Sequence, residues 1–240
     1  MNQPSGNVVR FTAWSAIIGG ILAYLTMGLL LSATGSDSGM IVNGAAMLAL
    51  PADMRELYRW SMIADTFGFY LPFLVIGGYL LHAFREELGA LGTMVAFAIV
   101  LYVMVGVTGA LTQAGIIHPL ADLSAGGDQA TRVAAAAAWT AVSHAAQNGL
   151  WWIEGPLVLF FGFVIANVLK KNGWKGTLLL KLASGFYGLF FVSGFFLDLE
   201  EVSSTCEMVG VLVLPAWMLL FGWQLLRRSG ASVESSPTLA

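Results

Sequence analysis

Charged residues and cysteine are scarce in this sequence. Of its 240 residues, 10% are Asp, Glu, Lys or Arg, whereas 58% are hydrophobic, and the mean hydropathy is +0.78. Because soluble domains carry about a quarter charged residues, this composition excludes an ordinary water-soluble domain. The only cysteine, Cys206, excludes an internal disulfide bond and a cysteine-based metal cluster.

Common catalytic and binding motifs are also missing. The sequence contains no glycine-rich phosphate loop, no Cys-x-x-Cys, no His-Glu-x-x-His and no Gly-x-Ser-x-Gly. The net charge of −3 gives no reason to expect a nucleic-acid partner. We therefore predict neither nucleic-acid binding nor a cofactor.

What the sequence does contain is long apolar runs. Residues 11–31, 88–121 and 208–226 include no Asp, Glu, Lys or Arg. An uncharged apolar run of about 20 residues matches the hydrocarbon thickness of a bilayer. These runs do not alternate polar and apolar residues, as membrane β-strands would, so they predict helices.

The apolar runs predict an all-α, polytopic membrane bundle. We place six transmembrane helices at about residues 11–33, 61–83, 91–117, 144–169, 177–197 and 207–226. They form one predicted domain over residues 1–228, with the lipid bilayer as its main partner. Residues 229–240 are rich in serine and small side chains and predict a disordered tail.

The distribution of basic residues predicts the orientation. With six spans and a cytoplasmic N-terminus, only Arg55, Arg59 and Arg132 lie outside. The other eight basic residues lie on the cytoplasmic side, as the positive-inside rule requires: Arg10, Arg85, Lys170, Lys171, Lys175, Lys181, Arg227 and Arg228. A seventh span would reverse this distribution. We therefore expect both termini in the cytoplasm and location in the cell (inner or plasma) membrane.

Polar side chains gather in the outer half of the predicted bundle, most clearly on the fourth span. At 100° per residue, six of its positions fall within about 120° of one another. They are Thr140, His144, Gln147, Asn148, Trp151 and Glu154. Because such a stripe is costly in lipid, we expect it to face the bundle interior. It forms either a pocket open to the outer side, with Glu154 deepest, or a hydrogen-bonded seam between helices.

Other acidic residues extend this polar region. Asp65 lies near the start of the second span and either shares a cavity with Glu154 or interacts with Arg59. A shared cavity of low dielectric would suit one of the two carboxyl groups to act as a general acid. In the last outer loop, Asp198 is a further candidate, whereas Glu207 follows Ser204 at the spacing of a helix capping box.

Three residues near the outer ends of spans three and four are candidate metal ligands. His118 and Asp122 are four residues apart, and His144 begins the fourth span. Imidazole and carboxylate groups suit Zn²⁺ or copper. However, Pro119 interrupts the spacing and no known ligand pattern is matched, so we predict no metal site.

One segment carries a family resemblance. The run Leu-Tyr-Arg-Trp-Ser-Met-Ile-Ala-Asp at residues 57–65 is followed by a span and an Arg-Glu-Glu loop. Together with the hydropathy layout, it resembles a family of uncharacterised six-span bacterial integral membrane proteins. That family has no established activity, so the resemblance implies only the six-span architecture.

These observations leave three functional hypotheses open. The first is a small membrane-embedded enzyme that acts on a lipid or isoprenoid-type hydrophobic substrate, with Asp65 and Glu154 as catalytic acid and base. Its substrate-binding residues would be His144, Gln147, Asn148, Trp151 and Asp198. The second is a transporter or channel component with an outward vestibule, and the third is a non-catalytic subunit or sensor. The sequence identifies no protein partner.

Overall fold

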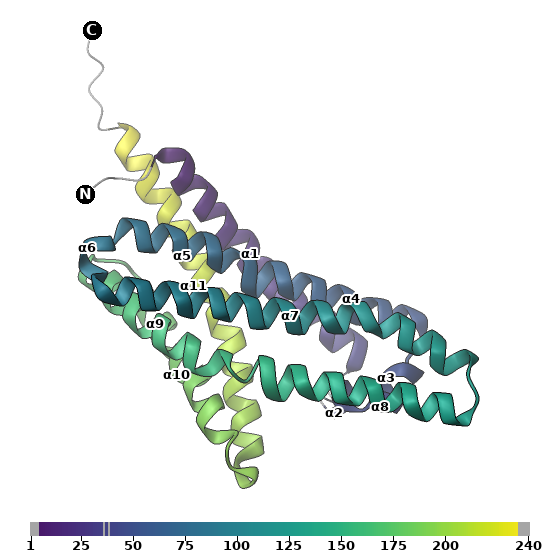
Figure 1. Cartoon of the computed structure of the whole chain (residues 1–240). Coiled ribbons are helices and arrows are strands. Elements are labelled where there is room, and N and C mark those ends of the chain that lie inside the picture. Colours follow the sequence, from purple (N-terminus) through teal and green to yellow (C-terminus); the bar gives the residue numbers. More distant parts are fainter. Residues whose placement is uncertain (1–4, 36, 38, 235–240) are drawn as a thin grey trace.

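The computed structural model of the chain describes residues 5–35, 37 and 39–234, and within these ranges it contains helices and turns but no strand. The predicted all-α fold is thus confirmed. The elements follow in the order α1 (Gly6–Thr34), α2 (Gly39–Val42), α3 (Gly44–Ala49), α4 (Ala52–Asp65), η1 (Thr66–Tyr70), α5 (Leu71–Ala83), α6 (Arg85–Leu88), α7 (Ala90–Gly126), α8 (Gln129–Ala145), η2 (Ala146–Leu150), α9 (Glu154–Lys171), α10 (Thr177–Ser193), η3 (Leu197–Leu199) and α11 (Glu200–Glu234) (Figure 1).

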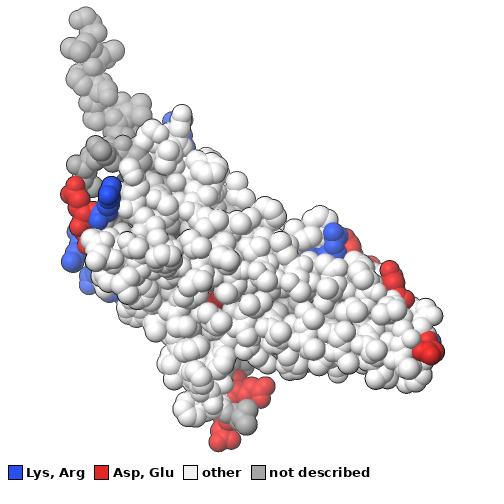
Figure 2. All heavy atoms as spheres, viewed as in Figure 1, with Lys and Arg blue, Asp and Glu red and all other residues white. Residues whose placement is uncertain are grey.

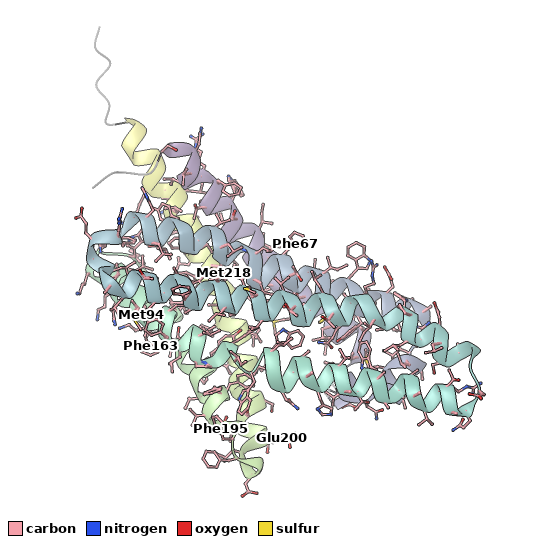
Figure 3. All side chains as sticks on the ribbon, in the orientation of Figure 1. Phe67, Met94, Phe163, Phe195, Glu200 and Met218 are labelled. Atoms are coloured by element: carbon pink, nitrogen blue, oxygen red, sulfur yellow. The ribbon has the colours of Figure 1, made fainter. Side chains whose placement is uncertain are left out.

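Within the described ranges, five helical stretches are long and apolar enough to cross a membrane. They are Gly6–Thr34, Ala52–Ala83, Ala90–Gly126, Gln129–Lys171 and Glu200–Arg228. These helices fit a multi-pass membrane protein. The sixth apolar helix, α10, has 17 residues and is shorter than the others. Large apolar side chains on the outside of the bundle, such as Phe67, Met94 and Phe163, are exposed and suited to contact lipid (Figure 3).

The chain runs back and forth so that its turns gather at two ends (Figure 1). At one end, which we call the terminal end, lie both ends of the described chain, α6 and the turn between α9 and α10. At the opposite end the helices diverge into two arms. The long arm contains α2, α3, α4, α8 and the C-terminal part of α7, and the short arm contains the adjoining ends of α10 and α11.

The half of the molecule next to the terminal end is tightly packed with aromatic rings. Phe73 stacks on Trp217 with 6.2 Å between ring centroids, and Trp217 stacks on Phe221 at 5.3 Å. Phe161 packs against Phe73 at 5.7 Å. A cavity of about 10 Å³ beside these rings has an apolar lining and room for about one water molecule. The described residues that line this cavity are aromatic, aliphatic or glycine.

Basic side chains mark the terminal end. Arg227 lies over the ring of Trp223 at 3.8 Å, and Arg228 lies over Trp174 at 4.1 Å. Charged groups gather at this end, along the outer part of the long arm and at the tip of the short arm, while the surface between them is almost entirely uncharged (Figure 2). Stacked arginine and tryptophan residues are typical of a membrane interface.

The long arm has its own core, which holds α2 and α3 against α8. The indole nitrogen of Trp139 donates to the carbonyl of Ile41 at 2.8 Å, and the backbone nitrogen of Gly44 donates to the hydroxyl of Thr140 at 3.0 Å. Gly44 has no room for a Cβ, because its backbone approaches the carbonyl of Ala136. The short helices α2 and α3 are thus packed along the side of α8.

Local chemistry sets several helix ends. Asp128 accepts a hydrogen bond from the backbone nitrogen of Thr131 at 2.9 Å and caps the start of α8. This bond holds the pKa of the exposed Asp128 carboxyl group below its usual range. Asn43 caps α3 by accepting from Ala46 at 3.1 Å. Gly89, with φ of +50°, provides the left-handed backbone between α6 and α7.

The C-terminal helix is longer than the sequence predicts. α11 continues to Glu234, so residues 229–234 of the predicted tail are helical in backbone. The remaining tail residues, 235–240, lie outside the described part of the chain. With 37 residues, α7 is about 55 Å long, nearly twice a bilayer core, and it extends into the long arm.

Candidate functional site

Two of the long apolar helices are interrupted by a π-helical turn next to an acidic residue. Asp65 is the last residue of α4 and directly precedes the π turn η1. Glu154 is the first residue of α9 and follows the π turn η2 after a turn at residues 151–153. π turns are rare and frequent at functional sites, and irregular backbone inside a membrane requires surrounding protein or a lined cavity.

The two acidic residues meet at one tyrosine. Asp65 and Glu154 are buried, with 8% and 4% of their surface exposed. The hydroxyl group of Tyr70, in η1, is placed to donate a hydrogen bond to the carboxyl group of either residue, and the two carboxyl groups interact electrostatically. We call Asp65, Glu154 and Tyr70 the carboxyl site.

The carboxyl site lacks positive charge. The ion pairs found among the described residues join Glu56 to Arg59 and to His118, so neither Asp65 nor Glu154 has a basic partner there. In addition, Oε1 of Glu154 is buried and has no hydrogen-bond partner in the part of the chain that the structure describes. Burial of an ionised carboxylate without a cation or full hydrogen bonding costs free energy, so the site is electrostatically incomplete.

A third acidic residue lies beside the site. Glu207 interacts electrostatically with Glu154 and with Tyr187. The expectation that Glu207 belongs to a helix cap is wrong, because α11 already begins at Glu200. The hydroxyl of Ser204 instead donates to the backbone carbonyl of Glu201 at 3.1 Å.

The sequence did contain a signal for Glu207. It precedes Gly210 by three residues and Leu214 by seven, and both of these residues are buried. Residues at these spacings share one helix face, so Glu207 belongs to the face that points into the bundle. The capping-box pattern instead predicted that Glu207 lies at the start of the helix.

Glycines make room for the rings around the site. Gly106 of α7 lies against the ring of Tyr70, so closely that a Cβ would overlap it. A Cβ on Gly109 would lie 2.7 Å from Nε1 of Trp151, and one on Gly210 would lie 2.9 Å from the ring of Tyr187. These three glycines therefore position the aromatic walls of the site.

The π turn η1 is itself stabilised from α7. The hydroxyl of Tyr102 donates to the carbonyl of Phe69 at 3.1 Å. Trp151 approaches the carbonyl of Gly106 with its indole nitrogen at 3.4 Å and is half-buried. The tyrosines at and around the site come from three different helical stretches, and a linear reading of the sequence gave no reason to group them.

The side chains of the polar stripe predicted on the fourth span do not all point to the same environment. His144 and Asn148 are exposed and hydrogen-bond to each other at 3.0 Å, so the expectation that they face the interior is wrong. The buried face of α8 runs one residue earlier, through Trp139 and Ser143, which both donate to the carbonyl of Ile41. The π turn then ends this register before Glu154.

The remaining stripe residues take intermediate positions. Gln147 and Trp151 are half-buried, in or directly after η2.

Asp198 is exposed in η3 at the tip of the short arm and forms no hydrogen bond or ion pair with any residue in the described ranges. The structure thus brings together Asp65 and Glu154 of the predicted site, with Trp151 nearby, but not Asp198, His144 or Asn148.

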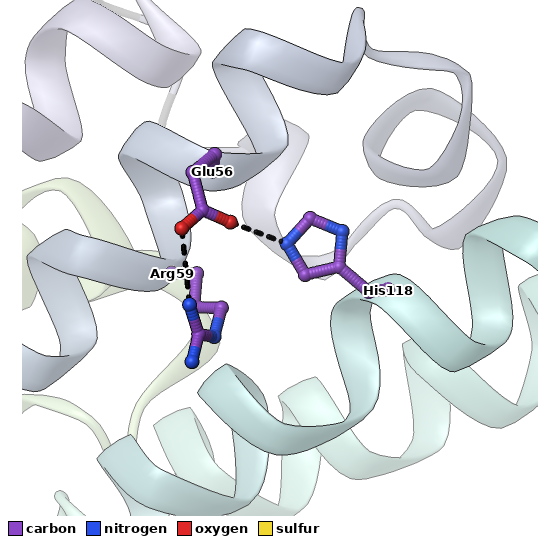
Figure 4. Close-up of polar contacts among 3 residues, drawn as sticks. All are labelled: Glu56, Arg59 and His118. Atoms are coloured by element: carbon purple, nitrogen blue, oxygen red, sulfur yellow. Dashed lines mark hydrogen bonds and ion pairs between the residues drawn. The ribbon is translucent and has the colours of Figure 1, made fainter.

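The metal-ligand candidates also lie apart. Nε2 of His118 contacts Oε2 of Glu56 at 2.8 Å, and the same carboxylate contacts Arg59 at 3.0 Å (Figure 4). Asp122 and His144 are exposed. Within the part of the chain that the structure describes, no three His, Cys, Asp or Glu residues are grouped as a metal site would need.

A separate polar seam lies in the long arm. The hydroxyl of Tyr58 donates to Oε1 of Gln113, and the hydroxyl of Ser143 lies 3.2 Å from the same oxygen. All three side chains are buried. Nε2 of Gln113 has no partner in the described residues. This seam joins α4, α7 and α8 and gives the long arm a fixed arrangement.

Comparisons with protein-family models, with curated proteins and with solved structures found no match for this chain. The resemblance of residues 57–65 to a family of six-span membrane proteins therefore stays a prediction.

Proposed function

We propose that the chain is a multi-pass membrane transporter, or the membrane part of one, and that Asp65 and Glu154 bind its coupling ion. The observation that supports this proposal is the meeting of two buried carboxyl groups, each next to an interrupted helix. Among the described residues, one of their oxygen atoms has no hydrogen-bond partner and no basic side chain is bound to them. Interrupted helices with acidic side chains form the ion sites of many secondary transporters.

The site provides a simple coupling mechanism. When a proton or another cation neutralises the carboxyl groups, the cost of their burial falls and the closed arrangement is favoured. When the ion leaves, the uncompensated charges favour an arrangement in which water reaches them. The ion thus shifts a population between two states by its different affinity for each.

We place the entry to the site on the arm side, because stacked aromatic rings fill the terminal half. The two arms diverge on the opposite side (Figure 1). Transport would require these rings to separate in a second state. We further propose that the chain crosses the membrane six times, with α10 as the short fifth span. Both termini then lie in the cytoplasm, and the protein is located in the plasma membrane. The eight basic residues predicted on the cytoplasmic side support this orientation.

Currents from purified protein in liposomes on a solid support test the proposal. Jumps in pH and in a panel of solutes should produce transient currents from the wild-type protein. Glu154→Gln and Asp65→Asn each remove one ionisable carboxyl group at nearly constant volume, so they should reduce the currents at least tenfold. Glu86→Gln, an exposed carboxyl change in α6, is the matched control and should behave as wild type.

Two results would count against transport. A wild-type protein that gives no current under any jump contradicts the proposal, as do unchanged currents in both carboxyl variants.

A membrane-embedded enzyme that acts on a lipid or isoprenoid-type substrate is the second candidate. It is favoured by the closed terminal half, since an enzyme needs access from one side only. Asp65 and Glu154 would exchange a proton through the hydroxyl of Tyr70, as acid and base. Lipid extracts of cells that produce wild type or Glu154→Gln should then differ in one substrate and one product. Identical lipid profiles argue against this candidate.

A further inference from the structure

The carboxyl site has oxygen atoms but no counter-charge. Three oxygen-bearing side chains meet there, two carboxyl groups and one phenol. A third carboxyl group, that of Glu207, adds negative charge next to Glu154. A single hydroxyl proton of Tyr70 is available for the two carboxyl groups that it can reach. At least one carboxyl group is therefore left without a hydrogen bond from this phenol.

The unpartnered oxygen of Glu154 is a second observation, separate from the missing counter-charge. Oε1 is buried, and no donor in the described residues reaches it. Buried acceptors without a partner are rare in folded proteins and call for a specific explanation, such as an absent ion. A cation can satisfy several oxygen atoms at once, which one hydroxyl proton cannot do.

The donor set limits which cation fits. Carboxylate and hydroxyl oxygens are hard ligands and suit hard cations rather than copper or zinc, which prefer nitrogen and sulfur. Ca²⁺ takes six to eight oxygen ligands, and no group of three acidic or other metal-ligating residues is close enough within the described chain to begin such a site. Two carboxyl groups and a phenol hold only five oxygen atoms, fewer than Ca²⁺ takes, so a monovalent hard cation suits the site better.

We infer that Asp65, Glu154 and Tyr70 form a binding site for Na⁺. The ion lies between the two π turns and is bound by Oε1 of Glu154, by the carboxylate of Asp65 and by the phenol oxygen of Tyr70. It joins two helical stretches, Ala52–Ala83 and Gln129–Lys171, at the point where each departs from α-helical geometry. Glu207 contributes negative potential from α11 without being a ligand.

This inference rests on the proposed function for the role of the ion, but the binding itself can be tested separately. The thermal unfolding midpoint of the purified protein in detergent is measured in 100 mM NaCl and in 100 mM choline chloride. A ligand that binds the folded state only and is present at about ten times its dissociation constant should raise the midpoint by about 3 °C for a chain of this size. Glu154→Gln and Asp65→Asn should abolish this shift, and Glu86→Gln should retain it.

Direct binding of radioactive ²²Na⁺ provides the second measurement. Wild type should bind about one ion per chain, and Tyr70→Phe, which removes one ligand but keeps the ring against Gly106, should weaken binding at least threefold. This variant remains informative if a carboxyl variant fails to fold. Equal midpoints in the two salts, or ²²Na⁺ binding that persists in both carboxyl variants, overturns the inference.

The two proposals fail in different ways. Currents driven by pH alone, together with no effect of Na⁺ on the wild-type midpoint, support transport and overturn the Na⁺ site. A Na⁺-dependent midpoint that both carboxyl variants abolish, with no current under any jump, supports the site and contradicts transport.

Discussion

Individual glycines decide where the rings of the carboxyl site lie. Gly106 receives the ring of Tyr70, whereas Gly115, nine residues further along α7, has open space where a Cβ would be. The two positions share one helix but differ in what a methyl group would meet. Substitution by alanine should therefore have opposite effects at the two sites.

Gly106→Ala should destabilise the protein by about 1–3 kcal/mol, because the added methyl group must push the Tyr70 ring out of its position. Gly115→Ala should be neutral or stabilising by about 0.5–1 kcal/mol, since alanine is the better helix former. Thermal or denaturant unfolding in detergent measures both. Equal effects of the two substitutions would show that Gly106 is not a contact point for Tyr70.

The hydroxyl groups of two tyrosines, Tyr58 and Tyr79, should contribute differently to the free energy of unfolding. Tyr58 is buried and donates to Gln113, whereas Tyr79 is half-buried, packs against Phe221 and forms no hydrogen bond in the described structure. Tyr58→Phe should cost about 1–3 kcal/mol, because Oε1 of Gln113 loses a donor in a buried place. Tyr79→Phe should change the free energy of unfolding by less than about 0.5 kcal/mol. A larger loss for Tyr79→Phe than for Tyr58→Phe would contradict the seam.

At the scale of elements, the important feature is the interruption of two helices at the same site. Tyr70 follows Asp65 by five residues. If α4, η1 and α5 formed one regular α-helix, these two side chains would lie on different faces of it. The π turn widens the helix by closing over five residues and brings the two side chains within reach of each other. Each interruption thus changes which side chains can meet.

A contact between α4 and α7, in contrast, should contribute little to the free energy of unfolding. His118 and Glu56 join the two helices at 2.8 Å, but their side chains are 35% and 42% exposed (Figure 4). His118→Ala should therefore cost less than about 1 kcal/mol, and the loss should shrink at high salt. Unfolding at 0.05 and 0.5 M salt measures this. A salt-independent loss well above that figure would mean that the pair has a structural role beyond a surface ion pair.

At the scale of the whole molecule, charge is segregated to the ends. Charged side chains mark the terminal end, the outer part of the long arm and the tip of the short arm, and the uncharged surface between them suits a bilayer (Figure 2). With one native cysteine, the chain is convenient for labelling from either side of the membrane. The orientation can therefore be tested directly.

Cys206→Ala is the background for single cysteines at Glu87 and Lys171 of the terminal end and at Asp128 and Glu200 of the two arm tips. Glu200 lies at the tip of the short arm (Figure 3). A membrane-impermeant maleimide added to intact cells should label the two arm positions at least tenfold faster than the two terminal positions. Labelling of Glu87→Cys and Glu200→Cys from the same side would contradict six crossings.

The sequence by itself determined the all-α membrane fold, because long apolar runs without charge admit few other structures in lipid. It also singled out Asp65 and Glu154, since acidic residues inside apolar helices are costly whatever the fold. The placement of His144 and Asn148 could not be obtained this way. Helical spacing gives the angle between side chains but not which face the neighbouring helices cover, and Trp139 and Ser143 took the inward face instead.

Only the tertiary structure decided what surrounds the two acidic residues. Tyr70 reaches both of them because a π turn changes the helical register, and Glu207 joins them because α11 starts at Glu200, before the cap at Ser204 that the sequence pattern suggested. Both effects depend on packing between helices that are distant in sequence. Periodicity within one helix carries no information about such contacts, so the carboxyl site becomes visible only when the helices are assembled.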